Sequence, residues 1–192
     1  TAGASKDGGA ISLGAVNSTT GTQYLKSIVI DARSTNATPG TDGIVRLNGG
    51  IAVDRQATGD AITISSADVR LTAAADTAFT FSTNQTAANQ AGNVNLSAAT
   101  ISATNVGIDL TIDTSSSTDT KAGSVQLGVF GNTGGGQYLN NLTVTATDGT
   151  GAGGQVTLNG DVRLDYSSTT GNFVVNNGNA PVVIAKSLTI DT

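Results

Sequence analysis

The chain has 192 residues without Cys, Met, Trp or His, and all of its 14 acidic residues are Asp. Disulfides and metal sites built on thiolate or imidazole ligands are therefore excluded. The formal net charge of −5, with only 9 Lys and Arg, argues against a nucleic acid partner, and no apolar run approaches the roughly 20 residues needed for membrane insertion.

The same composition favours strands over helices. Glu and Met, two good helix formers, are absent, whereas Asp and Asn belong to turns. Val, Ile, Leu, Thr and Ala fill short apolar runs that are separated by Gly, Asn, Ser and Asp, which is typical of strands joined by turns. We therefore expect an all-β protein.

Short triplets that read apolar, variable, apolar recur along the whole chain. Their first residues stand 14 to 17 positions apart, at Ile11, Ile28, Val45, Ile62, Phe79, Val94, Leu110, Val125, Leu142, Val156, Phe173 and Leu188. The period of two within each triplet turns one face of a strand inward and the other outward. A beat of about 16 residues is typical of a β-solenoid, in which these twelve residues would form the stacking core.

Secondary triplets follow some of the main triplets by six to nine residues and begin at Ile51, Val69, Val162 and Val182. A corner is expected between the two triplets of such a pair. Asn48, Gly49, Asn159 and Gly160 stand at two of these corners, and we expect them to be structural turn residues because Gly and Asn adopt positive φ at low cost.

The number of residues in one rung is open between two values. One beat per rung gives rungs of roughly 16 residues and a rod on the order of 55 to 60 Å long, whereas two beats give rungs of roughly 32 residues. The triplet at Ile11 and the segments after it return from Val125, 114 residues later (125 − 11), which is seven beats. Because an odd number of beats would put equivalent segments on opposite sides of a two-beat rung, we favour one beat.

This long repeat also sets the expected domain organisation. Residues 1–113 form one copy and residues 114–192 an incomplete second copy. We expect residues 1–192 to be one continuous solenoid segment within a longer array. Its unpaired strand edges favour either end-to-end self-association or continuation in the same chain.

Three segments of the second copy carry a resemblance to a known family. They are Gly123 to Leu127, Tyr138 to Val144, and Gly154 to Leu164. They resemble the repeats of filamentous-haemagglutinin-like bacterial exoproteins, through degenerate apolar and Gly patterns that cover most of the chain. The resemblance implies a right-handed parallel β-helix at the bacterial cell surface or outside the cell, acting as a filament, stalk or adhesin, without catalytic residues or cofactors.

Tyr24 and its repeat counterpart Tyr138 each precede an apolar triplet. We expect both side chains to be partly buried as packing lids, and stacking against a carbohydrate is the alternative role. Contact with a host surface or a glycan is a further expectation, since loops on one face of a solenoid commonly bind partners.

Three alternatives stay open. A carbohydrate-active β-helix enzyme, of lyase or hydrolase type, would need converging carboxylates, and Asp109 with Asp113 or Asp161 with Asp165 are the candidates. Asp residues recur at equivalent places in the repeat, which favours a role as hydrogen-bonding residues at corners over a catalytic role. An ice-binding solenoid would need unbroken outward Thr rows, and tandem β-sandwich domains would need antiparallel strand pairs.

Overall fold

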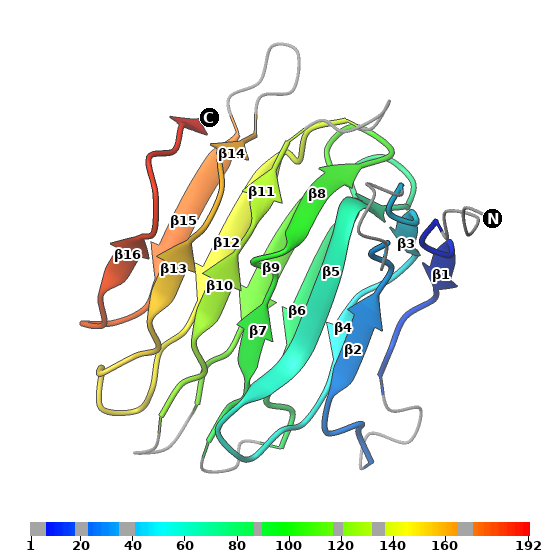
Figure 1. The fold of residues 1–192 in the computed structure, drawn as a ribbon. Helices are drawn as coiled ribbons and strands as arrows, with labels where there is room; N and C mark the ends of the chain where they lie inside the picture. Colours follow the sequence, from blue (N-terminus) through cyan, green and yellow to red (C-terminus); the bar gives the residue numbers. More distant parts are fainter. Residues whose placement is uncertain are drawn as a thin grey trace, which may run out of the picture.

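A computed structural model describes residues 7–17, 23–34, 41–86, 90–116, 121–131, 137–164 and 171–192. These residues form 17 β-strands and no helix, and every pair of named strands is parallel. The strands stack side by side from the N-terminal to the C-terminal end of the molecule (Figure 1). The predicted parallel β-helix is confirmed, and tandem β-sandwich domains are excluded.

The strands form three sheets, here named A, B and C. Sheet C contains β2 (Ile28–Asp31), the first part of β5 (Asp60–Leu71), β7 (Asn93–Asn95), β10 (Val125–Leu127), β13 (Val156–Leu158) and β16 (Val182–Ile184). Sheet A contains β1 (Ile11–Leu13), β3 (Val45–Leu47), the second part of β5, β8 (Ala99–Ala103), β11 (Val129–Phe130), β14 (Val162–Arg163) and β17 (Ile190–Asp191). Sheet B contains β4 (Ile51–Ala52), β6 (Ala78–Ser82), β9 (Asp109–Asp113), β12 (Asn141–Thr145) and β15 (Asn172–Asn176).

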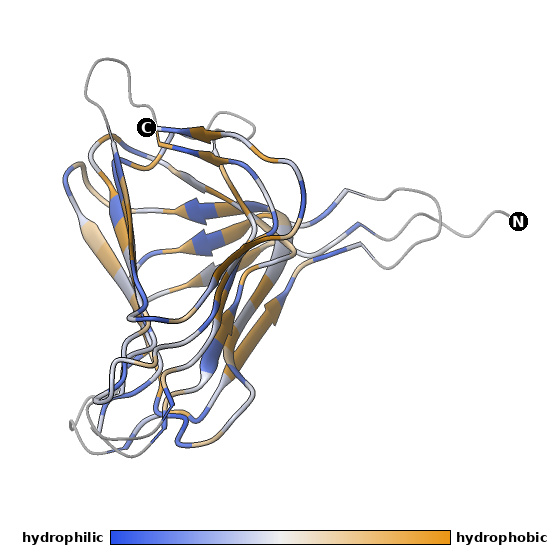
Figure 2. Ribbon diagram, turned by 90° about the vertical axis from the view of Figure 1, so that its left-hand side faces the viewer, coloured by the Kyte–Doolittle hydropathy of each residue, from blue (hydrophilic) through white to orange (hydrophobic). Residues whose placement is uncertain are grey.

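From β2 onward, each turn of the chain passes through sheets C, A and B in that order. In the view turned by 90°, the three walls of strands enclose one interior (Figure 2). Apolar side chains from all three sheets fill this interior as a single cluster. The alternation of inward apolar and outward polar residues, which the triplets predicted, is thus what closes the solenoid.

One turn takes two beats, so the favoured rung of roughly 16 residues is wrong and the alternative of roughly 32 is correct. The steps along sheet B run from Ile51 to Phe81, Ile112, Val144 and Val175. These residues are 30, 31, 32 and 31 positions apart (81 − 51, 112 − 81, 144 − 112, 175 − 144). The chain makes about five turns, which at ~4.8 Å per turn gives a stack about 24 Å long.

The long repeat of the sequence is out of phase with the turn. Ile11 lies in sheet A but its counterpart Val125 lies in sheet C, and Ile28 lies in sheet C but its counterpart Leu142 lies in sheet B. Each of these segments of the second copy therefore lies on a different sheet from its counterpart in the first copy. Equivalent segments of the two copies do not share a side of the solenoid, because equivalent apolar triplets occur in different sheets.

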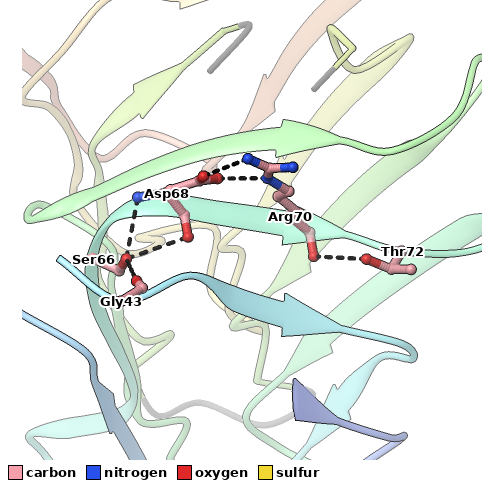
Figure 3. Close-up of polar contacts among 5 residues, drawn as sticks. All are labelled: Gly43, Ser66, Asp68, Arg70 and Thr72. Carbon is pink, nitrogen blue, oxygen red and sulfur yellow. Dashed lines mark hydrogen bonds and ion pairs between the residues drawn. The ribbon is translucent and has the colours of Figure 1, made fainter. Parts of the chain in front are cut away.

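Strand β5 passes from sheet C to sheet A without interruption, and Ser66 lies at the bend (Figure 3). The Ser66 hydroxyl is fully buried, donates to the carbonyl oxygen of Gly43 at 2.7 Å and accepts from the Asp68 amide at 3.1 Å. Asp68 also accepts two hydrogen bonds from Arg70, at 2.8 and 2.6 Å. The bend therefore buries no unsatisfied hydroxyl, which would be costly in this interior.

Buried hydroxyl groups also donate to backbone carbonyl oxygens where sheet B leads into sheet C. The buried hydroxyl of Thr83 donates to the carbonyl oxygen of Gly92 at 2.8 Å, and the buried hydroxyl of Thr114, one turn later, donates to that of Gly123 at 2.6 Å. A Cβ on Gly123 would collide with the carbonyl oxygen of Gly92. Glycine is needed there for close approach of neighbouring turns.

Candidate functional site

A pocket lies beside Tyr24, just before β2. It has a volume of about 580 Å³ and is lined by Gln23, Tyr24 and Lys26 together with residues 54–57, which follow β4. The Asp54 amide donates to the Leu25 carbonyl oxygen at 2.8 Å, so the two segments stack on neighbouring turns. A single turn of the solenoid thus brings residues about 30 positions apart into one pocket.

The carboxylate of Asp54 is held in place by three donors. It accepts hydrogen bonds from the Gln85 amide at 3.0 Å, the Thr86 hydroxyl at 2.8 Å and Gln56 Nε2 at 3.0 Å. Burial alone would raise the pKa of Asp54, but these hydrogen bonds outweigh it and lower the pKa below its ordinary value. Asp54 is therefore a hydrogen-bond acceptor at this corner and is ionised at neutral pH.

Two cations line the same pocket. Arg55 Nη2 donates to the Thr58 carbonyl oxygen at 3.2 Å, while Arg55 Nε is buried without a hydrogen-bond partner. Lys26 is exposed. Neither residue belongs to an ion pair between described residues, where the three pairs join Arg33 to Asp31, Arg70 to Asp68 and Arg163 to Asp161. The pocket therefore carries two cations and one anion on a chain that is acidic as a whole.

Tyr138 lines a smaller pocket of about 230 Å³ on the outside of sheet A, together with residues 129–131, Asp161 and Arg163. Arg163 Nη2 lies 3.7 Å from Asp161 Oδ2. Both Tyr138 and Tyr24 are half-buried. Each therefore has part of its ring against the solenoid and part at the rim of a pocket, a geometry that fits both the packing lid and the stacking role.

The twelve predicted core residues all face the interior. Eight are no more than 1% exposed, and Ile11, Ile28, Phe173 and Leu188, from the first and last turns, are partly buried against the same cluster. They do not form one column, because alternate beats lie on different sheets. Val94 pairs with Val125 in sheet C, whereas Leu110 pairs with Leu142 in sheet B.

Asn48 and Asn159 lie at the predicted corners, directly after β3 and β13. The backbone amide of Asn48 donates to the Leu13 carbonyl oxygen at 2.7 Å, and the backbone amide of Asn159 donates to the Leu127 carbonyl oxygen at 2.9 Å. Asn48 Nδ2 reaches the same Leu13 oxygen at 3.0 Å. Each corner is therefore hydrogen-bonded to the preceding turn of the solenoid.

Gly49 and Gly160 are at these corners for a different reason from the predicted one. Neither has a positive φ, in contrast to Gly59, and the same is true of Asn48 and Asn159. A Cβ on Gly49 would lie 2.8 Å from Ala15, and a Cβ on Gly160 would lie 2.6 Å from Val129 Cγ2. Close packing between successive turns, rather than backbone conformation, requires these glycines.

Of the two candidate pairs of catalytic carboxylates, the described residues contain both members of only one, Asp109 and Asp113. Asp109 and Asp113 share the outer face of β9 as expected, and four residue steps along the strand put their Cα atoms about 13 Å apart. Asp109 accepts from Asn141 Nδ2 at 2.8 Å and Asp113 from the Ser115 amide at 2.9 Å. Asp161 accepts from the Thr189 amide at 3.0 Å, and its proposed partner Asp165 lies outside the described residues.

The middle residues of the apolar triplets, which would have to form the outward Thr rows of an ice-binding solenoid, are divided among all three sheets. In sheet B, Thr80, Thr111 and Thr143 are in register on three consecutive turns, and Val174 follows. In sheet C the corresponding row contains an asparagine and a glutamine, Asn95 and Gln126. The Thr row is therefore continuous only over part of one face.

The residues that line the Tyr24 pocket were largely missed by sequence reasoning. Lys26 is close to Tyr24 in the chain, but Asp54, Arg55 and Gln56 are brought to it by one turn of about 30 residues. Only the correct turn length would have predicted that contact. Among the described residues, no cluster of three or more possible metal ligands occurs, and no helix could span a membrane.

Comparison with protein-family models, with curated proteins and with solved structures found no match to this chain. The class of protein is thus defined by strand register alone, as a parallel β-solenoid.

Proposed function

We propose that this chain is a structural segment of an extracellular bacterial filament, stalk or adhesin body, without catalytic activity. The observation that carries the proposal is the stacking of every turn on the next through parallel backbone pairing. Because hydrogen bonds of parallel strands run along the solenoid axis, each added turn lengthens the rod without widening it.

Side chains reinforce this axial bonding. In sheet B, Asn172 Nδ2 donates to Asn141 Oδ1 at 3.0 Å, and Asn141 Nδ2 donates to Asp109 Oδ1 at 2.8 Å. Three successive turns are thereby connected on the outside as well as through the core. This series of side-chain hydrogen bonds supports a mechanical role, since side chains and backbone would share tension along the rod.

The last turn leaves part of the core pattern uncovered. Val182, Ile184 and Ile190 are 47%, 61% and 48% exposed, although they pair in register with the buried Val156, Leu158 and Val162. A further layer with the same pattern would bury them, either as a continuation of the same chain or as a second copy joined end to end. The resemblance to filamentous-haemagglutinin-like exoproteins supports the first arrangement.

The test of the surface role is immunogold electron microscopy. Antibodies raised against this chain should label thin projections on intact cells of the producing organism. Label that appears only after permeabilisation would contradict the proposed location. For the filament shape, the purified chain should form rods of uniform width that lengthen with protein concentration, and Ile184→Lys should shorten them.

The carbohydrate-active enzyme is the alternative function. Its candidate carboxylates Asp109 and Asp113 are far apart, which supports the structural role instead. Incubation with a panel of acidic and neutral polysaccharides tests this alternative directly, and we expect no release of reducing ends or of unsaturated products.

A further inference from the structure

The Tyr24 pocket has the features of a site for a sugar ring. Ligand pockets combine apolar surface with a few fixed polar groups that set orientation, and a half-buried tyrosine offers a flat apolar face beside a polar edge. Tyr24 lies at the rim with part of its surface open to solvent, and Gln23 and Gln56 line the same pocket with exposed side chains. Amide groups of this kind both donate to and accept from hydroxyl groups.

Asp54 adds a preorganised acceptor to the pocket. Its two oxygens receive three hydrogen bonds from neighbouring residues, which fixes the direction of the remaining lone pairs before any ligand arrives. Fixed polar groups lower the entropic cost of binding, because they need not be ordered by the ligand. A sugar hydroxyl can donate to such a carboxylate.

The charges select the class of sugar. Lys26 and Arg55 line the pocket, and neither is ion-paired to another described residue. Asp54 neutralises one of these charges, so the pocket keeps an excess positive charge on a chain whose net charge is −5. A ligand carboxylate would complement this excess positive charge.

We propose that this pocket binds one residue of an acidic polysaccharide, with the sugar ring against Tyr24, a hydroxyl on Asp54, and the uronic carboxylate toward Lys26 and Arg55. The structure thereby assigns a binding site to the corner between β4 and β5. The proposal does not depend on the filament role, because it concerns a pocket formed within two adjacent turns.

The test uses a galacturonic acid trimer and the neutral galactose trimer as probes, with NMR titration of the whole chain. The acidic trimer should bind saturably and at least about tenfold more tightly than the neutral one. Tyr24→Ala and Lys26→Gln should each weaken binding of the acidic trimer by about tenfold, and Tyr24→Phe, which keeps the ring, should bind like the parent chain.

Tyr138→Ala is the matched control, since Tyr138 has the same place in the repeat and similar burial but a much smaller pocket. It should leave binding unchanged. Equal loss in Tyr138→Ala, equal affinity for both trimers, or absence of saturable binding would each overturn the proposal. Lys26 is exposed, so Lys26→Gln keeps the test decisive even where Tyr24→Ala disturbs folding.

Discussion

The carbonyl oxygen of Gly92 fills the space that a side chain on Gly123 would need, one turn further along the solenoid. Gly154 stands in the same relationship to Gly123. The three glycines form a row at the corner between sheets B and C, where successive turns come closer than any Cβ allows. This row limits which residues can turn that corner.

We therefore expect Gly123→Ala to lower the free energy of unfolding by about 1–3 kcal/mol or more, because the backbone of two turns must move apart. Urea denaturation followed by circular dichroism measures the change. The control is Gly131→Ala, where a Cβ would meet nothing within 4 Å and where the change should stay within about 1 kcal/mol of zero. Equal effects of the two substitutions would contradict the close-approach explanation.

The alternation of inward and outward residues predicts opposite results at adjacent positions of β12. Leu142 is fully buried in the core, so Leu142→Ala should cost about 2–5 kcal/mol. Thr143 points outward, and Thr143→Ala should change stability by about 0.5 kcal/mol or less. Measured urea midpoints for both variants check the prediction, and a large loss at Thr143 would show that the outer face is packed against something.

The buried hydroxyl at the bend of β5 gives a third prediction. Ser66→Ala leaves the Gly43 carbonyl and the Asp68 amide without their buried partner, which should cost about 1–3 kcal/mol. Ser97 lies at the equivalent corner one turn later but is exposed, so Ser97→Ala should change stability by about 0.5 kcal/mol or less. Thermal unfolding of the two variants in the same buffer distinguishes these outcomes.

The pH dependence of stability follows from the absence of His and Cys. No side chain of ordinary pKa titrates between about pH 5 and pH 8, so the melting temperature should be flat there. The pKa of Asp54 is lowered in the folded state, so its contribution is present above its unfolded pKa of about 3.9 and is lost as the pH falls through the folded value.

Thermal melts between pH 8 and pH 2 test this expectation. Asp54→Asn should make the acid-side fall shallower. Asp31 is the comparison: the hydrogen bond from Arg33 lowers the pKa of Asp31 to about 2, but the pair is exposed, so Asp31→Asn should have the smaller effect. A melting temperature that changes by many degrees between pH 5 and pH 8 would contradict the account.

The sequence predicted the composition of the core well, because burial follows directly from the period of two within each triplet. Phe79, Leu110 and Val125 were all placed inward, and all are fully buried. The corner positions at Asn48 and Asn159 were also predicted, since polar residues interrupt the apolar pattern there. The reason for Gly49 and Gly160 was wrong, because the distance between neighbouring turns cannot be inferred from local backbone preferences.

The pocket beside Tyr24 shows where sequence reasoning stopped. The contact of Asp54 with the Tyr24 segment depends on how many residues complete one turn. With the favoured rung of roughly 16 residues the two segments would lie on turns that do not touch. With a turn of about 30 residues the Asp54 amide meets the Leu25 carbonyl oxygen.

The amino-acid sequence by itself determined that this protein is all-β, which residues face inward, and that the strands recur at regular intervals. Local alternation of apolar and polar residues is sufficient for that. Only the tertiary structure decided the number of beats in a turn, the face on which each copy of the repeat lies, and the residues that meet at Tyr24. Those properties depend on closing the chain into three sheets, and the apolar alternation does not specify the sheet, since Ile11 lies in sheet A and its counterpart Val125 in sheet C.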